Sequence, residues 1–157
     1  MIKKGNAMNL LHKTITFQPP MNKTTLSFRI DIPQDLHSLL IHIHYSPKYL
    51  MDQKEIQHLT MEGIQHWGYY LSEGNLSSIP KCDQIANLIT LSLNNNDAFL
   101  GFAHRHDPDM DLIISEDKAS PGFHRSCIHA GNIDVFLHAN YIASREVTYD
   151  LDVEGIL

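Results

Sequence analysis

The stretch "SLLIHIHYS", residues 38–46, decides how the rest of the chain is interpreted. Its apolar side chains fall on every second residue: Leu39, Ile41, Ile43 and Tyr45. Successive side chains of a β-strand point to opposite sides, so this alternation predicts a strand with one buried side and one polar side. His42 and His44 stand on the polar side, where they either bind a ligand or meet water.

The same period of two recurs along most of the chain. Alternation is clear in residues 25–33, 87–97, 131–142 and 145–154, and weaker in residues 13–17, 98–103 and 111–115. Short strands separated by turn residues are typical of antiparallel sandwiches and barrels. We therefore predict an all-β fold, an antiparallel, jelly-roll-like β-sandwich of about eight strands.

One segment departs from this period. Over residues 52–72 the apolar side chains lie mostly three or four positions apart: Ile56, Leu59, Ile64, Trp67 and Leu71. This spacing predicts one amphipathic helix, inserted after the second or third strand, which the pair Gly74-Asn75 can end. The length of the chain favours one domain, which we place at residues 10–157. We expect residues 1–9 to be disordered, with Met8 as an alternative start to Met1.

Charge excludes some classes of partner. Apolar residues make up 43% and charged residues 19% of the chain, as in ordinary globular proteins. The net charge of −6 argues against nucleic acid and anionic membranes, because both need a positive protein surface. Eleven histidines would offset this charge as they protonate near pH 6.

The expected location is the cytoplasm. Cys82 and Cys127 form no CxxC motif or disulfide framework. The first residues lack the apolar core of a signal peptide, and no stretch approaches the roughly 20 apolar residues of a spanning helix.

The histidine pairs allow a metal-binding interpretation. His42 and His44 point to one side of a strand, and His104 and His106 would do the same if their segment is extended. Four imidazoles on facing strands would hold a divalent metal, as in a cupin-like metal-dependent hydrolase. Against this, histidine fills the polar side of an antiparallel strand acceptably, and no carboxylate follows His44 before Asp52.

The segment "AHRHDPDMD", residues 103–111, suggests a different ligand. The sequence Asp107-Pro108-Asp109 is typical of a turn, so His104, Arg105 and His106 should lie at a strand end, where binding groups of a sandwich gather. A guanidinium matches phosphate or carboxylate oxygens. We therefore treat residues 104–107 as a candidate small-anion site, with a solvated turn as the alternative.

Two blocks of sequence resemble a known family. They are "NLITLSLNNNDAFLGFAHRH", residues 87–106, and "ISEDKASPGFHRSCIHAGNIDVFLHANYIASREVTYDLDV", residues 114–153. Both are similar to the β-rich domain that precedes the catalytic domain in bacterial PHP-type metal-dependent phosphoesterases. The likeness extends over residues 26–153, because "FRIDIPQDLHSLLIHIHYSPK" is similar to the opening of the same domain. The chain departs from the family pattern at Ile133, Ser126 and Leu100, where tryptophan, glycine and arginine would stand.

The resemblance implies a non-catalytic accessory or interaction module rather than an enzyme. Its implied partner is a PHP-type catalytic polypeptide, since this chain ends at Leu157, where the catalytic domain would begin. A homo-oligomer is the other expected assembly, because exposed sheet edges favour self-association.

Overall fold

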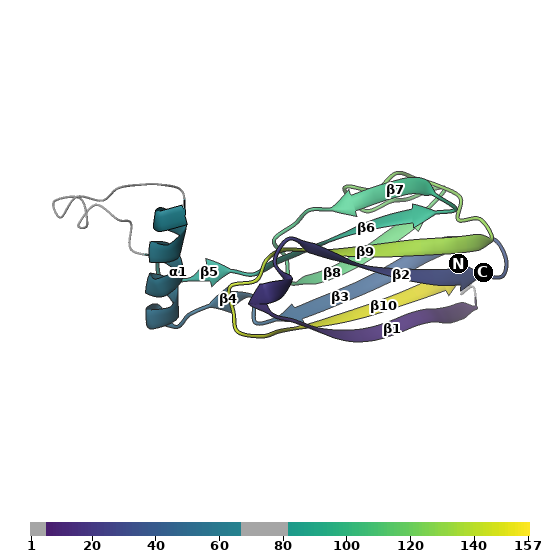
Figure 1. The fold of residues 1–157 in the computed structure, drawn as a ribbon. Coiled ribbons are helices and arrows are strands. Elements are labelled where there is room, and N and C mark those ends of the chain that lie inside the picture. The colour runs from purple at the N-terminus through teal and green to yellow at the C-terminus, as the bar shows by residue number, and fades with distance from the viewer. Residues whose placement is uncertain (1–5, 67–81) are drawn as a thin grey trace.

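The computed structural model describes residues 6–66 and 82–157, and within them the chain forms two packed antiparallel sheets (Figure 1). The strands are β1 (Ala7–Phe17), β2 (Thr24–Ile32), β3 (Ser38–Ser46), β4 (Tyr49–Leu50), β5 (Ile85–Ala86), β6 (Leu88–Asn95), β7 (Ala98–Ala103), β8 (Asp109–Ser115), β9 (Gly131–Tyr141) and β10 (Val147–Ile156). A short 3-10 helix, η1 (Pro19–Met21), joins β1 to β2, and α1 (Gln53–His66) lies between β4 and β5.

The order of the strands is that of a jelly roll. One sheet runs β1-β10-β3-β8, and the other runs β2-β9-β6-β7. Along the chain the first long strand pairs with the last, β2 with β9, β3 with β8, and β6 with β7. This nested pairing is a long double-stranded ribbon rolled into two sheets, so the predicted jelly-roll-like sandwich is confirmed.

The core lies between the sheets and is made by the alternating apolar residues. Ile41 and Ile43 of β3 are almost fully buried, as are their counterparts in β9 and β10. At one end of the core the rings of Tyr45 and Tyr149 stack at 5.7 Å, and Phe17 meets Tyr149 edge-on at 5.9 Å. Burial of this kind is the main favourable contribution to folding.

The start of the chain corrects one expectation. We expected residues 1–9 to be disordered, but β1 begins at Ala7, so this boundary is wrong for residues 7–9. Ala7 pairs with Ile156 and Met8 with Gly155. The partner strand lies at the other end of the sequence, which is why the local pattern does not reveal the order of these residues.

The helix stands at one end of the sandwich, carried by the short pair β4 and β5 (Figure 1). Asp52 caps it, because its Oδ1 accepts hydrogen bonds from the backbone N–H groups of Lys54 (3.0 Å) and Glu55 (2.9 Å). As predicted, the helix comes after the third long strand, β3, and begins close to residue 52, at Gln53. The predicted residues beyond His66, and the expected end at Gly74-Asn75, lie outside the described residues. The pair β4 and β5 was not predicted.

In the described ranges, no helix has both the length and the apolar character needed to cross a bilayer.

Candidate functional site

The outer side of the sheet β1-β10-β3-β8 carries two rows of polar side chains. Strand register aligns His12, Asp152, His42 and Asp111 in one row, and Thr14, Asp150, His44 and Asp109 in the next. We call these eight residues the His–Asp face. These side chains share one side of the sheet because each stands at an outward-facing position of its own strand.

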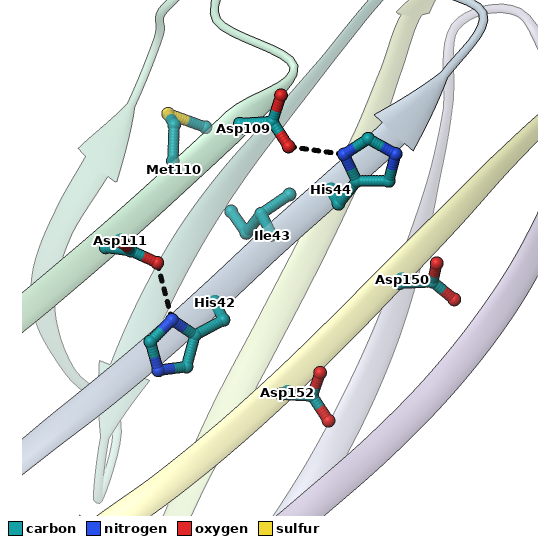
Figure 2. A pocket seen from close by; sticks show the side chains of 8 residues that line it. All are labelled: His42, Ile43, His44, Asp109, Met110, Asp111, Asp150 and Asp152. Atoms are coloured by element: carbon teal, nitrogen blue, oxygen red, sulfur yellow. Dashed lines mark hydrogen bonds and ion pairs between the residues drawn. The ribbon is translucent and has the colours of Figure 1, made fainter.

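Every imidazole of the His–Asp face is held by a carboxylate. His12 Nδ1 lies 2.5 Å from Asp152 Oδ1, and His42 Nδ1 lies 2.5 Å from Asp111 Oδ1. His44 Nδ1 likewise contacts Asp109 Oδ1 (Figure 2). In each pair Nδ1 is therefore the nitrogen in contact with the carboxylate.

The remaining aspartate belongs to the same surface. Thr14 Oγ1 donates to Asp150 Oδ1 at 2.6 Å. Asp150 and Asp152 project from β10 beside the two histidines of β3, and together they line a shallow hollow of about 320 Å³ (Figure 2). The hollow opens to solvent, and the side chain of Asp111 is 85% exposed.

The charge of this surface is of one sign. Glu154 continues the outer side of β10 in the next row, beside Leu40. The outer positions thus carry five carboxylates: Asp109, Asp111, Asp150, Asp152 and Glu154. The four strands contain one lysine or arginine, Lys13, which pairs with the buried Leu151 rather than joining either row.

The structure does not assemble the four-histidine metal centre. Within residues 6–66 and 82–157, no three or more His, Cys, Asp or Glu side chains are grouped so that they could hold a metal ion. His42 and His44 lie on β3, whereas His104 and His106 follow β7 of the other sheet. The described residues therefore lack the converging imidazoles that a cupin-like hydrolase requires.

The candidate anion site at residues 104–107 is an exposed link between β7 and β8, as the turn residues predict. Arg105 donates from its guanidinium to the carbonyl oxygen of Pro121 at 3.1 Å. The ring of His104 lies against Phe102 at 5.5 Å. Arg105 is thus engaged by the link between β8 and β9, and His104 by β7.

On the other sheet, His138 of β9 bridges two hydroxyl groups. Its Nδ1 lies 3.0 Å from Thr25 Oγ1, and its Nε2 lies 2.9 Å from Ser92 Oγ. Burial lowers the pKa of His138, because the charged imidazolium is poorly solvated there. The edge of the Phe102 ring packs against it. His138 is therefore a hydrogen-bonded bridge between β2, β9 and β6.

A second polar network joins the end of β3 to the loop between β9 and β10. Asn87 is fully buried, and its amide donates to the carbonyl oxygen of Pro47 and to Ser144 Oγ. Its Oδ1 accepts from the backbone N–H groups of Ala143 and Ser144. Beside it, burial raises the pKa of Tyr45 to about 12. This network fixes the loops at the α1 end of the sandwich.

Sequence reasoning found only part of the His–Asp face. His42 and His44 were singled out, but His12, Asp150 and Asp152 were not. The available signal was the repeat of aspartate at the polar positions of "DMD" (109–111) and "DLD" (150–152). It becomes a site only when β8 and β10 are placed on either side of β3.

No protein-family model matches the chain, and no curated protein sequence matches it significantly.

Proposed function

We propose that this protein is a non-catalytic jelly-roll accessory module that docks onto a protein partner through the His–Asp face. The observation that carries the proposal is the charge of that face. The solvated surface of a small domain normally mixes both signs of charge. Here the two rows hold four carboxylates, with Glu154 in the row beside them, and neither of the two rows contains a lysine or arginine.

The geometry of the face also suits docking. Its side chains are held by hydrogen bonds to one another and sit on four strands of a sandwich. Groups that are already ordered lose little conformational entropy when a partner arrives. A broad, shallow, polar face suits a protein surface better than a small substrate, which favours a deep and mostly apolar pocket.

The resemblance of residues 26–153 to the accessory domain of PHP-type phosphoesterases suggests the partner. We propose a PHP-type catalytic polypeptide, encountered in the cytoplasm. In this assignment the hydrolytic metal belongs to the partner, and the present chain supplies a docking surface.

The docking test uses purified components. The protein and a PHP-type phosphoesterase catalytic domain from the same organism are mixed, and their affinity is measured by isothermal titration calorimetry. Asp111→Lys reverses one charge of the His–Asp face, and Asp31→Lys makes the same change on an exposed position of β2 in the other sheet. We expect Asp111→Lys to weaken binding by about tenfold or more, and Asp31→Lys to leave it unchanged. Equal effects of the two variants, or no binding by the wild type, would refute this docking mode.

A second experiment tests the non-catalytic assignment. The purified protein is incubated with phosphate monoesters and diesters, and we expect no turnover. Turnover that is abolished by His104→Ala or His106→Ala would overturn the proposal. The small-anion site at residues 104–107 stays a prediction, which a thermal shift on addition of phosphate would support.

A further inference from the structure

Lys48, between β3 and β4, is held in place by its neighbours. Its side-chain nitrogen Nζ donates to the hydroxyl oxygen of Tyr45 and to the carbonyl oxygen of Asn87, each at 2.9 Å. The backbone N–H of Asn87 donates in turn to the carbonyl oxygen of Lys48 at 2.8 Å. Of the five lysines in residues 6–66 and 82–157, Lys48 alone is half-buried and donates hydrogen bonds from its side chain, and the other four are exposed.

The surroundings of the Lys48 amine are neutral and aromatic. Both oxygens that accept its hydrogen bonds belong to uncharged groups, and none of the ion pairs among the residues that the structure describes includes Lys48. The ring centroids of Tyr45 and Tyr49 lie 5.3 Å and 5.9 Å from Nζ. Burial lowers the pKa of Lys48, because the charged ammonium is poorly solvated there, and the charge of Asp107 opposes this shift. More of this amine is therefore uncharged at neutral pH than in an exposed lysine.

Tyr45 places a proton donor beside the same amine. Its hydroxyl oxygen accepts the hydrogen bond from Lys48, and its proton is directed to the carbonyl oxygen of Asn87 at 3.3 Å. Burial raises the pKa of Tyr45 to about 12, so the hydroxyl keeps its proton at neutral pH. An uncharged amine next to a protonated hydroxyl combines a nucleophile with a general acid, which are the two groups that condensation with a carbonyl compound uses.

We propose that Lys48 forms an imine with small aldehydes, with Tyr45 as the proton donor. The uncharged amine adds to the carbonyl carbon, a C–N bond forms, and one proton of the nitrogen passes to the carbonyl oxygen. The hydroxyl of Tyr45 then donates its proton to the resulting hydroxyl group, the C–O bond breaks and water leaves. The proton that remains on the nitrogen returns to Tyr45, so one amine and one aldehyde give one imine and one water.

The ring of Tyr49 favours an aromatic aldehyde. This ring is near Nζ of Lys48, and Tyr49 is 41% exposed. An aromatic group joined to Lys48 through the imine can pack against the ring, and aromatic pairs are stabilised beyond the area that they bury. The reaction consumes one aldehyde per chain without turnover, so it goes beyond the docking function and is compatible with a non-catalytic module.

The test is competitive labelling within one molecule. The full-length protein is incubated at neutral pH with benzaldehyde and sodium cyanoborohydride, which reduces each imine to a stable secondary amine. Peptide mass spectrometry then gives the rate at each lysine, with the exposed Lys23 and Lys118 as internal controls. The same reaction in guanidinium chloride gives the rates in the unfolded chain.

We expect Lys48 to react at least about threefold faster than either control in the folded protein, and at the same rate as the controls in the unfolded chain. Tyr45→Phe keeps the aromatic ring, and thermal melting verifies that it folds. This variant should slow imine formation at Lys48 at least about fivefold. It should leave acetylation of Lys48 by acetic anhydride undiminished, because acetylation needs the uncharged amine but no proton donor.

Three results would overturn the inference: labelling of Lys48 no faster than of the controls, the same preference for Lys48 in the unfolded chain, or equal slowing of both reactions in Tyr45→Phe. Butanal in place of benzaldehyde should lower the preference for Lys48, and an equal preference would refute the role of Tyr49. The docking proposal does not depend on Lys48, so either proposal can fail while the other stands.

Discussion

Replacing Asn87 by alanine should destabilise the protein more than any surface substitution. The change removes the acceptor of two buried backbone N–H groups, at Ala143 (2.7 Å) and Ser144 (3.0 Å), and the donor to the carbonyl oxygen of Pro47 (2.9 Å). Each buried polar group left without a partner costs about 1–3 kcal/mol. With partial relaxation of the loops, we expect Asn87→Ala to lower the free energy of unfolding by about 3–5 kcal/mol.

Equilibrium unfolding in urea measures this loss, because the midpoint falls while the slope with denaturant stays constant. The matched control is Gln53→Ala. The amide of Gln53 also donates two hydrogen bonds, to the carbonyl oxygens of Met51 and Asp83, but these bonds are exposed, so water replaces the amide and the loss stays below about 1 kcal/mol. Similar losses in the two variants would show that Asn87 does not organise the loops as described.

Three further results are expected. Gly101→Ala should lower the free energy of unfolding in urea by at least about 2 kcal/mol, because φ of Gly101 is +146° and an added Cβ would lie 2.4 Å from the backbone oxygen of Gly122. In contrast, an added Cβ at Gly63 in α1 meets nothing, so Gly63→Ala should be neutral or stabilising. Arg29 lowers the pKa of the Asp134 carboxyl, so the stability that this pair contributes is present above about pH 4 and is lost as the pH falls toward about 3. Over that range the midpoint of urea unfolding should drop less in Asp134→Asn than in the wild type. Burial lowers the pKa of His138, so below about pH 6.5 the unfolded chain binds more protons than the folded protein does. Between pH 7.5 and pH 5 the melting temperature should therefore fall less in His138→Gln than in the wild type.

The architecture could be predicted because it depends on a local pattern. The alternation of Leu39, Ile41 and Ile43 with polar neighbours is complete within one strand, and burial of one side follows from it. The start of α1 could be predicted from an equally local signal, because Asp52 precedes apolar residues spaced three to four positions apart.

The candidate site could not be predicted in full because it depends on partners far away in the sequence. Asp111 looks like the edge of a turn until β8 pairs with β3 and brings it to His42, 69 residues away. Asn87 looks like a residue before a strand until the folded chain surrounds its amide with two distant loops. The register between strands that are far apart in the sequence is set by the whole fold rather than by any short stretch of sequence.

The place of β10 in its sheet has a consequence for biosynthesis. Because β10 lies between β1 and β3, until Val147–Ile156 has left the ribosome β1 lacks its neighbour in the sheet and β3 can pair with β8 alone. Contacts of such long sequence separation form slowly, and unpaired strand edges are prone to aggregation in the meantime. The sheet β1-β10-β3-β8 therefore cannot be completed until β10 has been synthesised.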